Sequence, residues 1–177
     1  MIFATVGTQL PFDRLLHGLD SWASRNPSVP IFAQIGTSSG RFRHIETVPS
    51  LSQTEFAQRF EAARLVVSHA GMGTILSAAE MGKPLILMPR RAKFGEHRND
   101  HQQDTAAEMS RLSNLRVVAD GEDLHRALDR AAARGFPCLS PGADLAGREL
   151  EPLLEVIRDF VWDQTAAPKT TRIGKVA

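Results

Sequence analysis

Short apolar runs alternate along this chain with stretches that have the periodicity of amphipathic helices. Most of the apolar runs have the length of a buried strand and end in a turn that contains glycine or proline. The alternation predicts a Rossmann-like α/β fold, a three-layer sandwich with a mostly parallel sheet between helices. The predicted strands span residues 2–6, 29–35, 65–67, 85–88 and 115–118, and the predicted helices span residues 12–19, 52–63, 74–81, 99–112 and 122–134.

The length of 177 residues and the hydrophobic content of 42 % suit one globular domain. The formal net charge of +1, without a long basic block, gives no electrostatic reason to bind nucleic acid. No apolar run approaches the roughly 20 residues of a membrane-spanning helix, and the first run is too short for a signal peptide. We therefore expect a cytoplasmic protein that reaches a membrane only through a partner. Cys138 is the only cysteine, which excludes an internal disulfide, and a structural role is favoured for it.

Two glycines one residue apart, Gly71 and Gly73, stand between a predicted strand and a predicted helix. Glycine at such a junction permits a tight turn and lets backbone N–H groups approach a ligand closely. The N-terminus of the helix adds unpaired donors and a partial positive charge, which together suit a phosphate group. A plain strand-to-helix turn is the better explanation of a lone Gly-x-Gly. Because His69 and Thr74 flank these glycines, we favour a diphosphate site.

The loops after Val6, Val67 and Met88 all follow predicted strands of the same sheet. In parallel sheets the carboxyl ends of the strands share one edge, and ligands bind beyond that edge. The first of these loops begins with Gly7 and Thr8, a second glycine turn followed by a helix. The sequence therefore predicts that the three loops converge on one ligand site.

Three other kinds of site fit the sequence less well. A dinucleotide fingerprint needs a third glycine where this chain has Leu76, and it needs an acidic residue near position 90. A P-loop needs Ser or Thr after its Gly-Lys pair, where this chain has Pro84. A zinc hydrolase has two histidines four residues apart, as in His97 and His101, but it also has glutamate after the first, where Arg98 stands.

The sequence divides into three parts. Residues 1–135 hold the predicted sheet, residues 136–162 form a connector and an amphipathic helix, and we expect residues 163–177 to be a disordered tail. The apolar stripe of the helix either packs on its own domain or docks onto a partner or a membrane surface. Its members are Leu150, Leu153, Leu154, Ile157 and Val161.

The order of several short motifs resembles one protein family. These motifs are Thr5-Val6-Gly7-Thr8 with Phe12-Asp13, Ser68-His69-Ala70-Gly71-Met72-Gly73-Thr74, Gly82-Lys83-Pro84-Leu85 and Asn99-Asp100-His101-Gln102. Together they resemble the donor-binding half of GT-B glycosyltransferases of family 28, over about residues 1–135. The chain is similar in particular to small catalytic subunits of two-component N-acetylglucosaminyltransferases and of split bacterial exopolysaccharide and capsule transferases. The resemblance implies a single GT-B half-domain.

The resemblance also implies that a UDP-sugar lies across the loops at the carboxyl edge of the sheet. Its diphosphate would meet the residues of the two glycine turns, which are Gly7, Thr8, His69, Gly71, Met72, Gly73 and Thr74. His69 would donate a hydrogen bond to a phosphate oxygen while the leaving UDP gains charge; the alternative is a histidine satisfied by nearby backbone. His101 and Gln102 match a pair that contacts the hydroxyls of the donor sugar.

The remaining candidate residues keep two interpretations each. Asn99 precedes the sugar-contacting pair and either joins it or caps the helix. Ser77 stands where relatives have a ribose-binding glutamate, so either Glu80, one turn further on, meets the ribose or that contact is lost. Arg90 and Arg91 are either surface residues or partners for the diphosphate or for the carboxylate of a uronic acid donor.

The activity implied by the resemblance is inverting transfer of a hexose, N-acetylhexosamine or uronic acid from a UDP-sugar to a lipid-linked glycan acceptor in polysaccharide biosynthesis. Such transfer needs a base for the acceptor hydroxyl, and the chain offers no clear candidate. We therefore expect a membrane-anchored, acceptor-binding partner subunit that keeps the protein at the inner face of the membrane. No metal or other cofactor is expected beside the donor. The alternative is a non-catalytic accessory subunit that enhances or localises a partner transferase.

Overall fold

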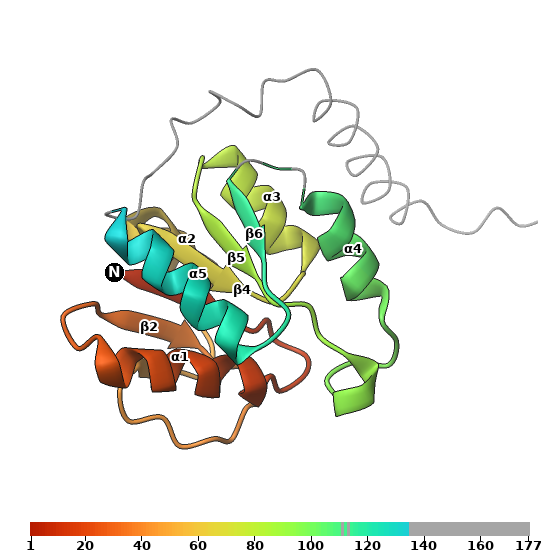
Figure 1. The fold of residues 1–177 in the computed structure, drawn as a ribbon, viewed down its shortest axis with the longest axis horizontal. Helices are drawn as coiled ribbons and strands as arrows, with labels where there is room; N and C mark the ends of the chain where they lie inside the picture. Colours follow the sequence, from red (N-terminus) through yellow and green to blue (C-terminus); the bar gives the residue numbers. More distant parts are fainter. Residues whose placement is uncertain (111, 113, 135–177) are drawn as a thin grey trace, which may run out of the picture. The chain divides into compact units, whose positions relative to one another are not determined.

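The computed structural model describes residues 1–110, 112 and 114–134, which form an open α/β sheet with its helices (Figure 1). Six strands run parallel in the order β3-β2-β1-β4-β5-β6. The strands are β1 Ile2–Thr5, β2 Ile31–Gln34, β3 Glu46–Val48, β4 Leu65–Ser68, β5 Leu85–Leu87 and β6 Leu115–Val117. The helices are α1 Asp13–Arg25, α2 Gln53–Ala62, α3 Met72–Glu80, α4 His101–Met109 and α5 Gly121–Ala133, with a short 3₁₀ helix η1 Ala92–Phe94. The predicted Rossmann-like fold is confirmed.

One face of the sheet is covered by α1 and α5, which lie side by side (Figure 1). The core on this face is made by alternate residues of the strands, such as Ile2 and Ala4 of β1, together with the apolar stripes of both helices. Trp22 of α1 is fully buried there, and its Nε1 donates a hydrogen bond of 2.7 Å to Oδ1 of Asp129 on α5. The indole therefore fills the core while its one donor is satisfied.

The opposite face of the sheet carries aromatic residues. Phe3, which alternates with Ile2 and Ala4, meets Phe56 and Phe60 of α2 edge to face, with ring centroids 5.3 Å and 6.2 Å apart. The helices α3 and α4 connect β4 to β5 and β5 to β6, in the direction opposite to the β1-to-β2 connection. Because such crossovers are right-handed, α3 and α4 lie on the face opposite to α1. The sheet is thus the middle of three layers, as predicted.

The strand order reverses direction at β1. The chain goes from β1 to β2 on one side and later returns to β4 on the other side. In an open parallel sheet this reversal leaves a crevice beyond the carboxyl ends of the two strands, where the flanking loops part. The loops after β1 and β4 are the two glycine turns, so the topology puts both at the crevice.

The structure differs from the sequence-based expectations in several elements. The edge strand β3 was not predicted, because its three residues lie in a polar loop and show no apolar alternation. The helix α3 begins at Met72, so Gly73 belongs to its first turn rather than to the preceding loop. The helix α4 is shorter than predicted at both ends. Cys138, the connector with its apolar stripe, and the tail lie outside the described residues.

Among the residues that the structure describes, no helix combines the length and the apolar character needed to cross a membrane.

The helix α2 begins with a capping box at Ser52. Ser52 Oγ accepts a hydrogen bond from the Glu55 N–H at 3.3 Å, and Glu55 Oε2 accepts one from the Ser52 N–H at 2.9 Å. These two bonds satisfy donors that the first turn of α2 would otherwise leave unpaired.

We expect Ser52→Ala to lower the free energy of unfolding by about 1 kcal/mol, because the first turn of α2 loses its side-chain acceptor. Urea denaturation followed by circular dichroism measures this change. The matched control is Ser24→Ala, an exposed serine within α1 whose Oγ donates to the Ser21 carbonyl, where we expect a change below about 0.5 kcal/mol. Equal losses in the two variants would contradict the role of the cap.

Candidate functional site

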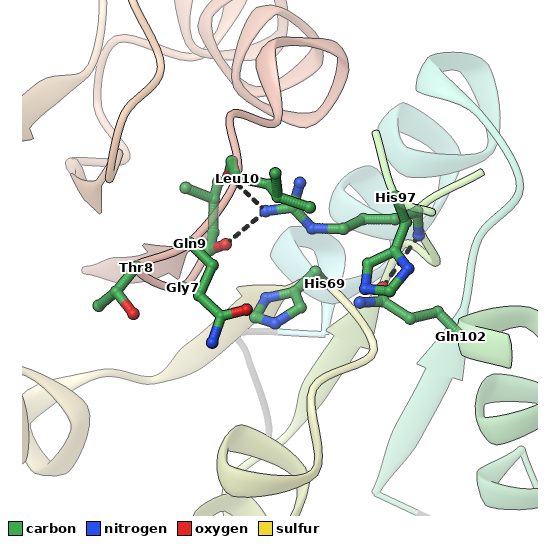
Figure 2. Close-up of a pocket in the computed structure, with 9 residues that line it drawn as sticks. Gly7, Thr8, Gln9, Leu10, His69, His97 and Gln102 are labelled. Carbon is green, nitrogen blue, oxygen red and sulfur yellow. Dashed lines mark hydrogen bonds between the residues drawn. The ribbon is translucent and has the colours of Figure 1, made fainter. Parts of the chain in front are cut away.

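A cavity of about 270 Å³ lies at the carboxyl edge of the sheet, at the reversal between β1 and β4. Figure 2 shows Gly7 to Leu10 on one side of it, His97 and Gln102 on the other, and His69 between them. The loops after β1, β4 and β5 all contribute, as the sequence predicted. The lining residues are Val6, Gly7, Thr8, Gln9, Leu10, His69, Arg90, His97 and Gln102.

The imidazole of His69 is held between two glycines. Gly7 has φ +76°, a left-handed conformation that favours glycine, and a Cβ there would lie 3.0 Å from His69 Cε1. A Cβ on Gly71 would clash with Nε2 of the same ring and would lie 2.9 Å from Cε1. Both glycines therefore leave room for His69, a packing reason that the sequence interpretation did not include.

His69 is uncharged at neutral pH. Burial, with a smaller contribution from the positive charge of Arg90, lowers the pKa of His69 from 6.5 to about 4. Nδ1 lies 3.3 Å from Ser68 Oγ, and the ring also forms a hydrogen bond with the Thr5 backbone. A neutral imidazole has one N–H donor and one acceptor. The Thr5 carbonyl takes the donor, so the other ring nitrogen is an acceptor, and the alternative interpretation of a histidine satisfied by nearby backbone fits the structure better than a hydrogen bond to phosphate.

The N-terminus of α3 is open to a ligand. Its N-cap is Gly71, which has no side chain to accept a hydrogen bond from the first turn. Within the described part of the chain, the N–H groups of Met72, Gly73 and Thr74 have no hydrogen-bond acceptor. Gly73 is exposed, and a Cβ there would meet no atom within 4 Å. Three unpaired donors and the positive end of the helix dipole give this turn the character of an anion site.

Arg90 is not a surface residue, which corrects one of its two interpretations. Its side chain is 3 % exposed, and its guanidinium donates to four backbone carbonyls. Nη2 reaches Val6 and Leu10, both at 2.7 Å, and Nη1 reaches Pro11 at 2.6 Å and Glu96 at 3.1 Å. Arg90 thus lines the cavity, but both of its Nη atoms are hydrogen-bonded to the β1–α1 loop and to the loop after β5. The uronic acid hypothesis gains no support from Arg90.

A second arginine, Arg14, fixes the loop after β5 from outside. Arg14 of α1 forms a two-pronged ion pair with Glu96, with Nε and Nη2 at 2.7 Å and 2.9 Å from the carboxylate oxygens. Glu96 is 8 % exposed, and its Oε2 also accepts from the Arg91 N–H at 2.9 Å. Arg14 donates further to the carbonyls of Pro89 and Ala119. The loop that carries Arg90 and His97 is therefore tied to α1 and to the turn before α5.

Gln102 is oriented toward the cavity by the same backbone. It is 6 % exposed, and its Oε1 accepts a hydrogen bond of 3.1 Å from the Arg90 N–H. With the oxygen engaged, the amide Nε2 is the group left for a ligand in the cavity (Figure 2). The structure brings Gln102 together with His69, as the sequence predicted.

His101 and Asn99 lie beside the cavity rather than in its lining. Both are exposed, and Asn99 Oδ1 forms hydrogen bonds with His101 Nδ1 and with Nδ1 of His97, the second at 3.2 Å. The rings of His97 and His101 meet edge to face, with centroids 4.5 Å apart. The N-cap residue of α4 is Asp100, whose Oδ1 accepts a hydrogen bond from the Ala92 N–H rather than from the first turn of the helix. The capping interpretation of Asn99 is therefore wrong.

The structure does not bring Glu80 to the cavity. Glu80 is exposed at the last position of α3. From the segment between β4 and α3 the cavity lining includes His69, but it does not include the predicted site residues Gly71, Met72, Gly73 and Thr74. Eight residues of helix separate Glu80 from Met72, which is about 12 Å along the axis. Ser77, where the sequence resemblance implies an acidic residue, is also beyond the first turn of the helix.

Sequence reasoning missed four residues of the lining, of which Val6 directly precedes the Gly7-Thr8 turn. Gln9 and Leu10 directly follow the Gly7-Thr8 turn, and extending that motif by two residues would have found them. His97 was considered only as a metal ligand with His101. Its place in the lining depends on the Arg14–Glu96 pair, whose members are 82 positions apart in the sequence.

An open parallel sheet with a glycine-lined cavity at its reversal point, beside an unpaired helix N-terminus, defines a nucleotide-binding α/β domain. Residues 1–135 match the model of the glycosyltransferase family 28 C-terminal domain, and the chain belongs to this family. The sequence resemblance is thereby confirmed.

Curated relatives are glycosyltransferases. One is the UDP-N-acetylglucosamine--N-acetylmuramyl-(pentapeptide) pyrophosphoryl-undecaprenol N-acetylglucosamine transferase of Solibacter usitatus, 33 % identical over 109 residues, which cover 55 % of this chain and 28 % of the relative. Another is the UDP-N-acetylglucosamine transferase subunit ALG13 of Yarrowia lipolytica, 28 % identical over 141 residues, 70 % of this chain and 67 % of the relative. The chain thus spans a little over a quarter of the first relative and two thirds of the second.

Solved structures share the fold. The solution structure of ALG13 superposes with a TM-score of 0.58 at 17 % identity, covering 91 % of this chain and 96 % of that one. MurG of Acinetobacter baumannii gives a TM-score of 0.57 at 18 % identity, covering 89 % of this chain and 49 % of that one. The second coverage is that of a half-domain within a larger enzyme, so the predicted single GT-B half-domain is confirmed.

We expect Arg90→Lys to lower the free energy of unfolding by about 3 kcal/mol, because an ammonium cannot reach four carbonyls that face a planar fork. Chemical denaturation at neutral pH measures this loss. The matched control is Arg91→Lys, since its Nε has no partner among the described residues, and we expect a change below about 0.5 kcal/mol. Arg90→Lys with the stability of the parent would refute the assigned role.

The pKa of His69 predicts a pH dependence of stability. In the unfolded chain the group titrates near 6.5, whereas in the folded protein it titrates near 4. Between these values the unfolded state binds the proton more readily, so stability is full above pH 6.5 and falls as the pH drops toward 4. The shift corresponds to a loss on the order of 3 kcal/mol. Denaturation at several pH values should show a shallower loss in His69→Asn; parallel profiles would contradict this account.

Proposed function

We propose that the chain is the donor-binding catalytic subunit of a two-component glycosyltransferase. It transfers a hexose, N-acetylhexosamine or uronic acid from a UDP-sugar to a lipid-linked glycan acceptor in polysaccharide biosynthesis. The observation that carries this proposal is the cavity lined by the Gly7-Thr8 turn and His69. The unpaired N–H groups of Met72, Gly73 and Thr74 stand at the start of the helix that follows His69. Membership in family 28 supports a nucleotide-sugar as the ligand.

In the proposed complex the diphosphate lies between the Gly7-Thr8 turn and the first turn of α3. The helix N-terminus stabilises negative charge without a metal ion, since its donors are backbone groups. His69 packs against Gly7 and so supports the turn beside the phosphates, and Gln102 Nε2 donates to a hydroxyl of the sugar. His101 and Asn99 border the same region and complete the sugar contacts. No cofactor other than the donor takes part.

The proposed chemistry is a single inverting displacement. The acceptor hydroxyl loses its proton to a general base, its oxygen forms a bond with the anomeric carbon of the sugar, and the bond to the UDP oxygen breaks with its electron pair leaving on UDP. The leaving diphosphate gains negative charge at this step. Donors already pointed at it by the folded backbone stabilise that charge with no further reorganisation.

The proposal includes a membrane-anchored partner subunit that binds the acceptor and supplies the general base. The relative from Yarrowia lipolytica is itself named a subunit, and this chain spans about half of MurG. The partner would hold the chain at the cytoplasmic face of the membrane. Two relatives are named N-acetylglucosamine transferases, which makes UDP-N-acetylglucosamine the first donor to test.

We expect the purified chain to bind UDP more tightly than UMP, and UMP more tightly than uridine, because the site is built around phosphate donors. Isothermal titration calorimetry measures the three affinities. A chain that binds none of these ligands or UDP-sugars favours the alternative proposal, a non-catalytic accessory subunit of a partner transferase.

The variant Gln102→Glu tests the proposed sugar contact in the same titration. The variant keeps an oxygen that accepts from the Arg90 N–H, but it replaces the Nε2 donor with a second acceptor. We expect the preference for UDP-N-acetylglucosamine over UDP to fall about tenfold, the loss of roughly one hydrogen bond. Gln103→Glu, at the exposed neighbouring position, is the matched control and should keep the preference. An unchanged preference in Gln102→Glu would exclude the proposed sugar contact.

A further inference from the structure

Three polar side chains lie in a row across the middle of the sheet. Thr5 is in register with Gln34 of β2 on one side and with Ser68 of β4 on the other. These three residues, the polar row, are buried, with exposures of 2 %, 4 % and 0 %. They alternate with Ala4, Ala33 and Val67, which belong to the core under α1 and α5, so the polar row lies on the opposite face.

Two members of the polar row contact residues of the cavity. Thr5 Oγ1 accepts a hydrogen bond of 3.3 Å from the N–H of Gly7. Ser68 Oγ lies 3.3 Å from His69 Nδ1. Gly7 and His69 both line the cavity, and they touch each other, since the ring occupies the space that a Cβ on Gly7 would need. The two hydroxyls, one on β1 and one on β4, therefore each bond to one of the two residues that form the contact between Gly7 and His69.

Fold stability does not explain the polar row. Buried polar groups cost free energy unless they are hydrogen-bonded, and Oε1 of Gln34 has no hydrogen-bond partner among the described residues. An apolar side chain in place of Gln34 would remove this unpaired oxygen, whereas the hydroxyls of Thr5 and Ser68 have their partners in residues of the cavity lining. The neighbouring positions of the same strands are apolar and fully buried. A sheet selected for stability alone would continue that pattern to the ends of β1, β2 and β4.

We propose that Thr5 and Ser68 are positioning residues for the donor site. Thr5 holds Gly7 in its left-handed conformation, and Ser68 holds the His69 ring between the two glycines. A serine hydroxyl both donates and accepts, so it fixes the ring in either tautomer. The effect on ligand binding rests on the proposed function, whereas the effects on Gly7 and His69 themselves do not.

Two substitutions of Thr5 separate an effect on stability from an effect on binding. Thr5→Val keeps the shape and removes the hydroxyl; we expect a melting temperature within about 3 °C of the parent and about tenfold weaker UDP binding. Thr5→Ser keeps the hydroxyl and removes a buried methyl group; we expect a lower melting temperature and parental UDP affinity. Thr47→Val on the edge strand β3 is the matched control and should leave UDP affinity unchanged.

A readout without ligand separates this inference from the proposed function. We expect Thr5→Val to speed hydrogen exchange of the Gly7 amide about tenfold, because its acceptor is lost. We expect Ser68→Ala to shift the ring nitrogen resonances of His69. Both effects in a chain that binds no UDP would support the positioning roles and refute the nucleotide site. A folded Thr5→Val variant with parental Gly7 exchange, or with parental affinity in a chain that binds UDP, would overturn the inference.

Discussion

The hydrogen bonds from the Arg90 guanidinium to backbone carbonyls are the interaction on which the site depends. They join the β1–α1 loop to the loop after β5, two segments about 80 residues apart in the sequence. Loop carbonyls at a buried edge need donors, because an unpaired one costs free energy comparable to a lost hydrogen bond. One planar guanidinium satisfies four of them. The Arg14–Glu96 pair then fixes the second loop on α1, so the cavity walls are held without a ligand.

This arrangement gives the cavity an unusual electrostatic character. Arg90 brings a positive charge to its lining, but the charge faces carbonyl oxygens. Burial, with a smaller contribution from this charge, lowers the pKa of His69. His69 is therefore neutral, and the donors offered to an anion are backbone N–H groups and one amide. Such donors are fixed by the fold and do not titrate near neutral pH. An anion bound there would keep its affinity over a wide pH range, provided that His69 remained neutral.

The sequence predicted the fold because its signals are local. Buried parallel strands are short apolar runs, amphipathic helices have their own period, and a capping box marks where α2 begins. The meeting of three loops at one edge followed from the parallel topology. The sequence did not predict that Arg90 is buried, that Glu80 lies away from the cavity or that His97 lines it. Each of these facts depends on contacts between distant segments. The strand β3 was missed because pairing with β2, rather than its own pattern, defines it.

Gly71 and Gly73, between β4 and α3, are glycines for different physical reasons, although the sequence motif treats them alike. At Gly71 a side chain would collide with His69, so this glycine is required by the protein's own packing. At Gly73 a side chain would meet nothing within 4 Å, so packing does not require glycine there. Glycine inside a helix costs about 1 kcal/mol relative to alanine. A residue that lowers helix stability and touches no neighbour fits the proposed donor site, in which a ligand would approach the backbone closely.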